Sequence, residues 1–529
     1  MLDELLAPFA TQYAPTGMVC SVDHLASGAG VALLRAGGSA ADAAVAASAV
    51  LAVTSQHLCG MGGDLYALVH TGTGPPAALN ASGRAGSGAD PERARAEGLT
   101  SLPLRGDIRS VPVPGCVDGW VALHERFGRL PLGDVLGPAI RYAEDGFPAS
   151  PTLAGLLKSV AHLPGAEDYR RSSPVRPGDL LRRPGVGRAL RAIAHGGRAA
   201  WYEGEFGEDL LRLGAGEYVA ADLARSQADW VEPLGLGVWG VDLWSVPPNS
   251  QGYLTLGAAR MAEELSLPDD PADPAWAHLL VEASRQAGHD RLSALHEHAD
   301  GPSLVADRRL AARRAQIGDR RAALAGEPPP LGGDTIHLAV VDGDRTGVSL
   351  IQSNAAGWGS NLVVPGARVF LHDRGIGFSL EAGHPAEYGP GRRPPSTLSP
   401  ALLTTPDGGL AGVLGTMGGD SQPQILVQIL ARLLHAHQEP GEAIAAGRWV
   451  LDAGPSGFAT WSPSTGGGVL VEGHAAAGWD AGLAARGHEV ARTGAFGHQY
   501  GHAHVILTGT DRLAGASDPR PRSGSASGY

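Results

Sequence analysis

The 529-residue sequence predicts a mixed α/β protein built in layers, and three observations lead to this fold class. Helical patterns followed by short apolar strands recur over residues 17–70. Residues from about 130 to 325 are mainly helical, and the chain changes to strands and turns from 335 to about 420. The hydrophobic fraction of 43% is close to that of globular proteins, so the chain can fill a large core. Recurring helix-to-strand order favours packed layers.

The first elements lie close to the N-terminus. Residues 17–22 are a short apolar run that predicts a strand, and helical patterns follow at about 24–36 and 40–53. The glycines in residues 60–63 interrupt the chain before a second strand at 65–70. The run at 40–53 is alanine-rich, contains Asp42 and is too short to cross a bilayer.

The later elements are bounded by proline and glycine. One break, residues 246–252, reads Val-Pro-Pro-Asn-Ser-Gln-Gly and predicts a turn. An amphipathic helix is predicted over Gln424–His437, whose apolar stripe consists of Leu426, Ile429, Leu430, Leu433 and Leu434. The final segment, residues 520–529, is rich in Ser, Gly and Arg, so we expect it to be poorly ordered.

Composition and charge narrow the class of partner. The formal net charge is −13 and there is no long basic run, which argues against nucleic acid or an anionic membrane as the partner. The three cysteines, Cys20, Cys59 and Cys116, form no CxxC pair and favour a reducing compartment. The N-terminus lacks the basic region and long apolar core of a signal peptide. We therefore expect a soluble, cytoplasmic protein.

Signals for metals and cofactors are weak. The histidine groups at 296–298, 435–437 and 498–504 lack the spacing of a HExxH helix or of a Cys/His zinc site. The glycines at 60–63 match neither a phosphate-binding loop nor a dinucleotide fingerprint, and no Gly-x-Ser-x-Gly elbow is present. We expect neither a metal nor a cofactor.

The most informative stretch surrounds Thr335. The prolines at 328–330 and the glycines at 332–333 form a loose approach, and an alternating strand begins at the threonine. This pattern suggests a nucleophile that is released when the peptide bond before it is cut. A threonine hydroxyl within a chain has no built-in base, whereas a new α-amino group with a pKa of about 7.7–8.0 can accept its proton. The alternative is an ordinary strand threonine.

The strand at 335–341 predicts a hairpin with residues 348–354. A turn centred near Asp344 and Arg345 would place Asn354 opposite Thr335 and Gln352 opposite His337. A slip of one residue would exchange the faces of the strand. In the predicted register, two side-chain amides lie beside the threonine.

A glycine pair precedes the predicted helix at 424–437. Gly418 and Gly419 allow close approach of a substrate, and amides at a helix N-terminus attract anions. They could therefore form an oxyanion hole. The alternative is a turn in which Asp420 or Ser421 caps the helix, and both interpretations can hold together.

Several segments together resemble the γ-glutamyltransferase (γ-glutamyltranspeptidase) family of N-terminal-nucleophile hydrolases. They follow the same order over nearly the whole chain: residues 17–19, 37–46, 113–120, 334–342, 393–400, 418–419 and 515–520. The sequences around 350–354 and 418–424 resemble the divergent branch that includes cephalosporin-acylase-type and oxamate-amidohydrolase-type enzymes.

The resemblance implies an α+β fold, a four-layer αββα sandwich made by two chains from one precursor. Cleavage between Asp334 and Thr335 would give a large subunit, 1–334, and a small subunit, 335–529, which stay associated as one intertwined catalytic domain. Thr335 would carry the acyl group as an ester, with the oxyanion on Gly418 and Gly419. The resemblance also allows a homo-oligomer of this heterodimer.

The resemblance further implies a substrate pocket. The family's carboxylate-binding hydroxyl pair falls on Ser396 and Thr397, its amide for the glutamyl amino group falls on Asn354, and its carboxylate-binding arginine falls near Arg84. A guanidinium there would clamp a carboxylate.

Three positions depart from the family pattern. Gln352 stands where a second threonine usually supports the nucleophile. Arg374 and Gly377 replace an amide and an acid that hold the substrate ammonium. An added cation and a lost acid favour an anion over an ammonium at this point.

The sequence therefore predicts an N-terminal-threonine amide hydrolase or acyltransferase acting on an anionic acyl amide. Glutathione-type γ-glutamyl compounds are the default donors. An acylase for another dicarboxylic acyl group, of the oxamate, glutaryl or cephalosporin type, is the enzymatic alternative. An uncleaved, non-catalytic homologue that serves as a binding protein is the other.

Overall fold

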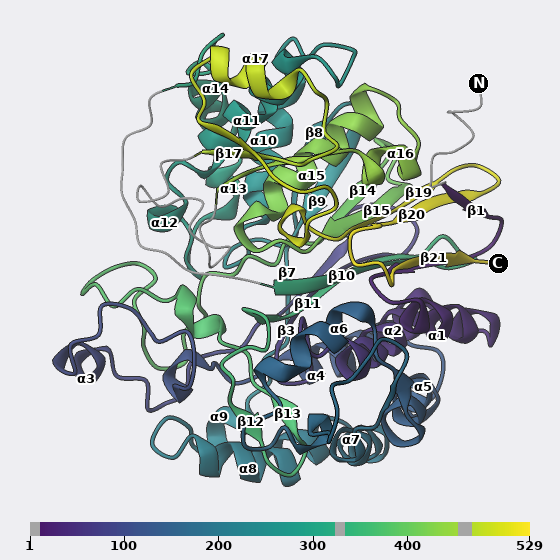
Figure 1. Ribbon diagram of the computed structural model, residues 1–529, viewed down its shortest axis with the longest axis vertical. Coiled ribbons are helices and arrows are strands. Elements are labelled where there is room, and N and C mark those ends of the chain that lie inside the picture. Colours follow the sequence, from purple (N-terminus) through teal and green to yellow (C-terminus); the bar gives the residue numbers. More distant parts are fainter. Residues whose placement is uncertain (1–10, 323–333, 453–467) are drawn as a thin grey trace.

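The computed structural model describes residues 11–322, 334–452 and 468–529. Two seven-stranded sheets face each other at its centre, with helices on both outer faces (Figure 1). This is the predicted four-layer αββα sandwich. The proline and glycine approach to Thr335 lies outside the described residues.

The first sheet contains the strand that begins at the candidate nucleophile. Its strands, in spatial order, are β21 (Ser525–Gly528), β2 (Met18–Ser21), β10 (Asp334–Val341), β11 (Gly347–Ala355), β3 (Asp64–His70), β4 (Ala77–Ala81) and β7 (Asp229–Val231). Every described pairing in this sheet is antiparallel.

The second sheet is also antiparallel. Its order is β1 (Gln12–Ala14), β20 (Leu513–Ser517), β19 (Ala503–Thr508), β15 (Leu410–Thr416), β14 (Ala401–Thr404), β9 (Val241–Ser245) and β8 (Leu234–Val238). Side chains from the inner faces of both sheets form one buried cluster, in which Ala339 and Ile351 meet Leu402, Val413 and Ile506. Period-two alternation directs these residues inward.

Helices cover the outer face of the first sheet. The main ones are α1 (His24–Arg35), α2 (Ala40–Thr54), α4 (Cys116–Phe127), α5 (Leu132–Asp145) and α7 (Pro184–Tyr202). All residues of α2 are buried, and Ser39 with Asp42 forms a capping box at its start. Its small alanines let it pack against both strands and helices, as its contacts with β10, β11, α1 and α5 show.

The second helical layer covers the other sheet. It contains α10 (Gly252–Glu263), α11 (Pro274–Gly288) and α15 (Gln422–Leu430), which share a core with β14, β15 and β19. The helix predicted at 424–437 begins two residues earlier and ends in a π-helical turn, Ala431–His435. The region predicted as mainly helical, 130–325, also contributes β7, β8 and β9.

Smaller elements surround these layers. The short helices are α3 (Pro91–Ala96), α6 (Pro151–Leu156), α8 (Glu205–Leu213), α9 (Ala220–Ala224), α12 (Arg291–Ala294), α13 (Gly301–Leu304), α14 (Asp307–Arg314), α16 (Pro440–Ala445) and α17 (Trp479–Ala485). The minor sheets pair β5 (Phe147–Pro148) with β6 (Leu180–Leu181), and β12 (Val363–Val364) with β13 (Val369–Phe370). A third joins β16 (Trp449–Leu451), β17 (Val469–Val471) and β18 (Val490–Arg492).

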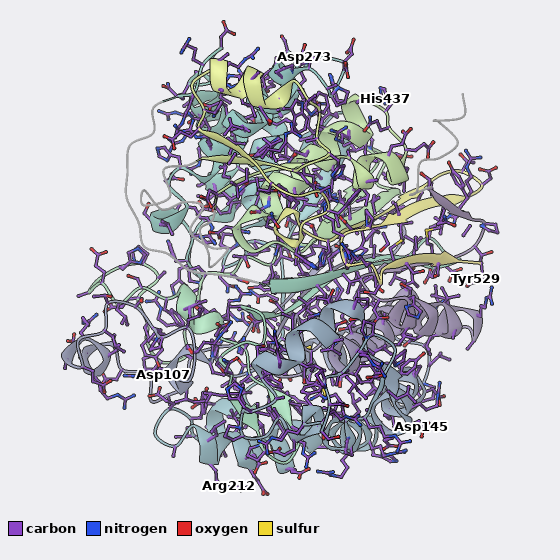
Figure 2. All side chains as sticks on the ribbon, in the orientation of Figure 1. Asp107, Asp145, Arg212, Asp273, His437 and Tyr529 are labelled. Atoms are coloured by element: carbon purple, nitrogen blue, oxygen red, sulfur yellow. The ribbon has the colours of Figure 1, made fainter. Side chains whose placement is uncertain are left out.

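The prediction of a poorly ordered C-terminal tail is wrong. Residues 525–528 form β21, which pairs with β2 at the edge of the first sheet. Tyr529, which Figure 2 labels, exchanges backbone hydrogen bonds with Gly17. Its ring lies beneath the Arg35 guanidinium. Small residues suit this narrow edge, because a Cβ on Gly528 would lie 2.4 Å from that of Ala14.

Candidate active site

Thr335 lies on the inner face of the first sheet, where the two sheets meet. Its side chain is fully buried, and its Oγ1 is 2.9 Å from the Oγ of Ser353 on β11. Residues 335, 337, 339 and 341 share this face, as the alternation predicted. The candidate nucleophile therefore has a neighbouring hydroxyl as its polar partner.

The hairpin register differs from the prediction by one residue. His337 is opposite Ile351, and Gln352 is opposite Ile336, with an irregularity between Asp334 and Ile336. Because side chains alternate between faces, this shift carries Gln352 to the outer face of the sheet and brings Ser353 to the inner face.

Gln352 and Asn354 consequently do not lie beside Thr335 as a pair of amides. The Gln352 Oε1 accepts a hydrogen bond from Ser48 of α2. The Nδ2 of Asn354 donates to the Gln56 carbonyl at 3.0 Å. Both amides are fully buried on the helix-covered side of the sheet.

Ser353 is the functional candidate that sequence reasoning missed. The second hydroxyl that the resemblance led us to expect at position 352 is present one residue later. The signal was the hairpin itself, because the one-residue slip already considered would have placed Ser353 on the face of Thr335.

Arg374 connects the nucleophile to a cavity. Its Nη2 is 3.4 Å from the Ser353 Oγ, and its Nη1 donates to the Thr397 Oγ1 at 3.2 Å. The two contacts through Ser353, 2.9 and 3.4 Å long, limit the separation of the Thr335 Oγ1 and the Arg374 Nη2 to 6.3 Å. A buried cation thus lies one hydroxyl away from the threonine.

Asp64 supports this arginine from behind. Its Oδ2 is 3.4 Å from the Arg374 Nε, and its Oδ1 accepts a hydrogen bond from the Gly83 amide at 3.0 Å. Burial alone raises the pKa of the Asp64 carboxyl, but the charges of His372 and Arg374 outweigh burial and lower that pKa below its usual range. Asp64 is therefore an anion that holds the guanidinium in place.

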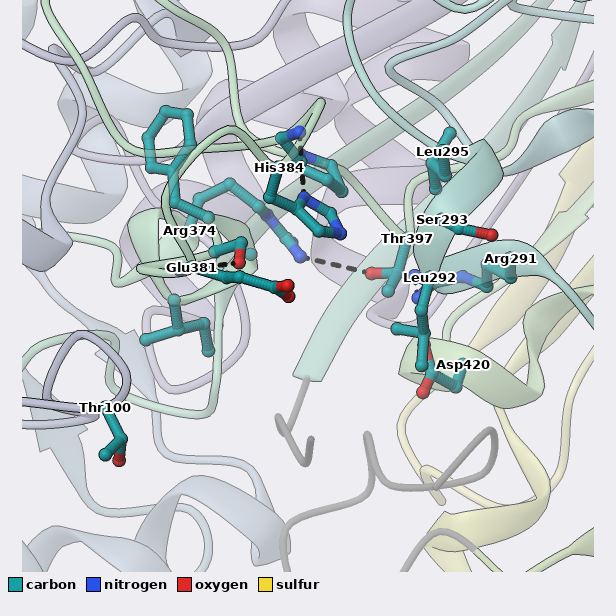
Figure 3. Close-up of a pocket in the computed structure, with 16 residues that line it drawn as sticks. Thr100, Arg291, Leu292, Ser293, Leu295, Arg374, Glu381, His384, Thr397 and Asp420 are labelled. Atoms are coloured by element: carbon teal, nitrogen blue, oxygen red, sulfur yellow. Dashed lines mark hydrogen bonds and ion pairs between the residues drawn. The ribbon is translucent and has the colours of Figure 1, made fainter. Parts of the chain in front are cut away.

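A cavity of about 460 Å³ opens beside these residues (Figure 3). Figure 3 shows Arg374 and Glu381 on one side of it and Arg291 and Asp420 on the other. Its lining also includes an apolar group: Leu292, Leu295, Ile376, Phe378, Ala386 and Pro395. The size is within the range of small-molecule sites. The polar lining residues include Arg291, Arg374, Glu381 and Asp420.

Of the predicted hydroxyl pair, only Thr397 lines the cavity. Ser396 is fully buried, and its Oγ accepts a hydrogen bond from the Leu398 amide at 3.3 Å. Gly377 also lines the cavity, and a Cβ there would lie 2.5 Å from the Pro395 carbonyl oxygen. Backbone packing therefore requires glycine at position 377. The missing side chain also leaves this part of the cavity wall without an acid.

The glycine pair lies at the end of β15. A Cβ on Gly415 would lie 2.3 Å from the His337 ring, so β15 approaches β10 closely near its first residues. Beyond Thr416 the chain turns through Gly418 and Gly419, which have φ values of +140° and +57°. These positive values favour glycine, and α15 begins three residues later. The loop thus enters the site between β15 and a helix N-terminus.

Arg84 does not reach the cavity. Its Nη2 forms an ion pair with Asp229 of β7, and its Nη1 donates to the Ser226 carbonyl at 3.2 Å. Asp229 also binds Arg393. The expectation that Arg84 clamps a substrate carboxylate does not fit these contacts, because its charge is used within the fold. The arginines that line the cavity are Arg291 and Arg374.

Two further observations concern metal ions and the membrane. Within residues 11–322, 334–452 and 468–529, no group of three or more His, Cys, Asp or Glu side chains could hold a metal ion. In those same ranges no helix has both the length and the apolar character needed to cross a membrane.

A four-layer αββα sandwich with a threonine hydroxyl at the start of a central strand defines the class of N-terminal-nucleophile hydrolases. The family model described as Gamma-glutamyltranspeptidase matches residues 26–529. The chain belongs to this enzyme family.

Relatives of the chain are similar over almost their full lengths. The "Glutathione hydrolase-like YwrD proenzyme" of Bacillus subtilis (strain 168) is 35% identical, covering 95% of this chain and 97% of that protein. The "Oxamate amidohydrolase proenzyme" of Klebsiella pneumoniae is 34% identical, covering 97% and 98%. The crystal structure of cephalosporin acylase from Bacillus halodurans superposes with a TM-score of 0.89 at 32% identity, covering 98% and 97%. The similarity thus includes acylases and amidohydrolases.

Proposed function

We propose that this protein is an autoprocessed N-terminal-threonine amide hydrolase whose donor is an acyl amide with a carboxylate close to the scissile carbonyl. The observation that carries the proposal is the buried Arg374, no more than 6.3 Å from the Thr335 hydroxyl through contacts of 2.9 and 3.4 Å. A guanidinium in such a site favours a carboxylate partner.

The first reaction is self-cleavage. The Thr335 Oγ attacks the carbonyl carbon of residue 334, the C–N bond breaks, and the α-amino group takes up the proton. Water then hydrolyses the resulting ester, which frees the carboxylate of residue 334 and regenerates the hydroxyl. The products are the proposed subunits, 1–334 and 335–529.

The proposed subunits have a physical reason to stay together. β10 belongs to the small subunit but pairs with β2 of the large one, and β11 pairs with β3. Each central sheet contains strands from both sides of the cut. Separation would therefore break ladders within both sheets.

Turnover uses the same hydroxyl. The new α-amino group accepts the Thr335 proton as Oγ attacks the acyl carbonyl, and the amides of Gly418 and Gly419 stabilise the oxyanion. The C–N bond of the donor breaks, and the leaving amine takes the proton. Water or an acceptor amine then takes the acyl group from the ester.

The donor we favour is a dicarboxylic monoamide such as an oxamate or a glutaryl amide. The short separation of Arg374 from Thr335 suits a carboxylate a few bonds from the scissile carbonyl. The apolar residues that line the same cavity suit an apolar group on the donor. The three free, buried cysteines support a cytoplasmic site of action.

γ-Glutamyl compounds such as glutathione are the second candidate. Their carboxylate would pair with Arg374, and their ammonium needs an acid. Two acids line the cavity, but Asp420 is 3.2 Å from the Arg291 guanidinium, which leaves Glu381 as the nearer match to an ammonium.

Self-cleavage is the first test. Wild-type protein should give two bands on a denaturing gel and two intact masses that fit a cut after Asp334. Thr335→Ala should remain full length and inactive, whereas Thr335→Ser, which keeps a hydroxyl, should still be cut. A single full-length wild-type band after long incubation would support the non-catalytic alternative instead.

The donor is tested with 4-nitroanilides that differ only in the acyl group. We expect kcat/KM for oxalyl or glutaryl donors to exceed that for γ-glutamyl by at least about tenfold, because only the γ-glutamyl donor carries an ammonium, which the Arg374 cation disfavours, and a buried charged group without a partner costs roughly 1–3 kcal/mol or more. The opposite order would favour the glutathione-type function. Arg374→Gln should lose this preference, while Arg84→Gln, a matched change outside the cavity, should keep it.

A further inference from the structure

The turn at residues 246–252 lies against the candidate site. The Gln251 amide donates to the Ser396 carbonyl at 3.0 Å, and the Ser396 amide donates to the Asn249 carbonyl at 2.8 Å. Gln251 is also the residue before α10. A turn from the region before residue 334 is therefore joined to the segment that supplies Thr397.

The Gln251 side chain joins two walls of the cavity. Its Nε2 donates to the Thr397 carbonyl and to the Gly419 carbonyl, each at 3.0 Å. Its Oε1 accepts a hydrogen bond from the Arg291 Nε at 2.9 Å. The amide is fully buried, so both of its N–H groups and its oxygen are committed to these contacts.

Arg291 completes this connection. It lies on α12 and lines the cavity, and its Nη2 is 3.2 Å from the Asp420 Oδ1 (Figure 3). Asp420 directly follows Gly419. The glycine loop is thus held at a carbonyl by Gln251 and at the next side chain by Arg291.

This restraint adds to the hydrogen bonds within the loop, in which the Ser421 amide donates to the Gly418 carbonyl and the Gln422 amide donates to the Gly419 carbonyl. Those bonds fix the local turn, but they do not join it to the opposite wall. Gly418 and Gly419 have no side chains to make that contact, so the position of the loop's amides relative to the wall depends on what else binds its carbonyls. Gln251 fixes the Gly419 carbonyl and ties it to the wall where Thr397 contacts Arg374.

We propose that Gln251, held by Arg291, is a positioning residue for acyl transfer at Thr335. Resting on the proposed function, it sets the distance between the glycine loop and the Thr397–Arg374 wall. Gln251 touches no substrate in this scheme. Gln251 belongs to the proposed large subunit, and the oxyanion donors and the carboxylate site belong to the small one. Its contacts across this boundary keep the oxyanion donors aligned with the carboxylate site.

The first variant removes the side-chain amide at nearly constant volume. Gln251→Leu should lower kcat about 10–100-fold, since a misplacement of about 1 Å costs about 100-fold, while KM stays within about threefold. Gln251→Glu should be equally impaired, because it keeps the oxygen facing Arg291 but offers no donors to the two carbonyls. Rates are measured per titrated, cleaved active site.

Gln428→Leu is the matched control. Gln428 of α15 is also buried, its Nε2 donates to the Gln424 and Trp449 carbonyls, and its Oε1 accepts from the Trp449 amide. The same groups are lost at contacts that do not include the glycine loop. We expect a similar fall in melting temperature but an unchanged kcat.

The outcomes separate the two hypotheses. A wild-type chain that neither cuts itself nor turns over donors overturns the proposed function. An active wild type in which Gln251→Leu keeps the kcat of Gln428→Leu overturns the positioning role. If Gln251→Leu folds but cuts itself too slowly for turnover to be measured, the rate of self-cleavage is compared in place of kcat. A rate of self-cleavage equal to that of Gln428→Leu would overturn the positioning role.

Discussion

At the scale of single residues, the buried Thr335 hydroxyl lies against the hydroxyl of Ser353. Only one of the two hydroxyls can donate across the 2.9 Å contact, and the Arg374 Nη2 lies 3.4 Å from the same Ser353 oxygen. A cation at that oxygen favours Ser353 as the donor to Thr335. Ser353 would then stabilise negative charge on the attacking oxygen.

This arrangement predicts the effect of removing the serine hydroxyl. Ser353→Ala should slow both self-cleavage and turnover by about 10-fold or more, the loss expected for a hydrogen bond of roughly 1.5–3 kcal/mol to a charged group. Time courses on denaturing gels and anilide release measure the two rates.

Ser349→Ala is the control for that prediction. Ser349 is buried on the same face of β11, where its Oγ donates to the Leu414 carbonyl and lies 3.0 Å from the His337 Nε2. Its loss should affect stability but not chemistry. Equal rates in the two variants would remove Ser353 from the mechanism.

At the scale of elements, β10 gains its position from partners at both ends of the chain. β2 pairs with β10 on one side, and β21 pairs with β2 on the other, so the C-terminal strand forms the edge of the sheet that holds Thr335. An antiparallel ladder depends on backbone groups, and composition alone does not reveal it.

Truncation tests this role of β21. Deleting residues 525–529 should destabilise the uncut Thr335→Ala protein by about 2–6 kcal/mol, if roughly four hydrogen bonds contribute 0.5–1.5 kcal/mol each. The melting temperature measures the loss. A disordered tail would leave that temperature unchanged. A Ser525→Ala and Ser527→Ala double variant keeps the backbone ladder and should melt close to the parent.

At the scale of the whole molecule, the core between the sheets contains uncharged histidines. The rings of His337 and His504 stack with centroids 5.7 Å apart, and both side chains are fully buried. Burial lowers the pKa of His504 to about 4 against an ordinary value of 6.5, with Asp518 opposing the shift. Burial also lowers the pKa of His337.

These pKa values predict acid sensitivity of the fold. As pH falls, the unfolded chain takes up a proton at His504 near 6.5, whereas the folded chain takes it up near 4. The stability contributed by the neutral ring is therefore complete above about pH 6.5 and lost towards pH 4, by at most about 3 kcal/mol for this group.

The measurement is the melting temperature of uncut Thr335→Ala protein between pH 7.5 and 4.5. His504→Leu should flatten the decline, because the titrating ring is gone. His298→Leu, at a position whose side chain is 74% exposed, should leave the slope unchanged. Parallel slopes for the two variants would contradict the role of the buried ring.

Local pattern predicted much of this molecule. The strand at Thr335, the early helices and the glycine turn before α15 all follow from alternation, helical spacing and glycine pairs, which depend on neighbours in the chain. The layered fold followed from the order of those elements. These features survive in the structure because each is decided within about fifteen residues.

The sequence by itself determined that a strand begins next to Thr335 and that a glycine turn precedes α15. Only the tertiary structure decided which side chains surround it. One irregularity in the hairpin turned Gln352 away and brought Ser353 in, because strand faces alternate. Arg84 forms an ion pair with Asp229, and Gln251 donates a hydrogen bond to the Gly419 carbonyl. Both contacts join segments more than a hundred residues apart. Side-chain contacts at that sequence separation form only when the sheets and helices have packed together, so local sequence patterns do not predict them.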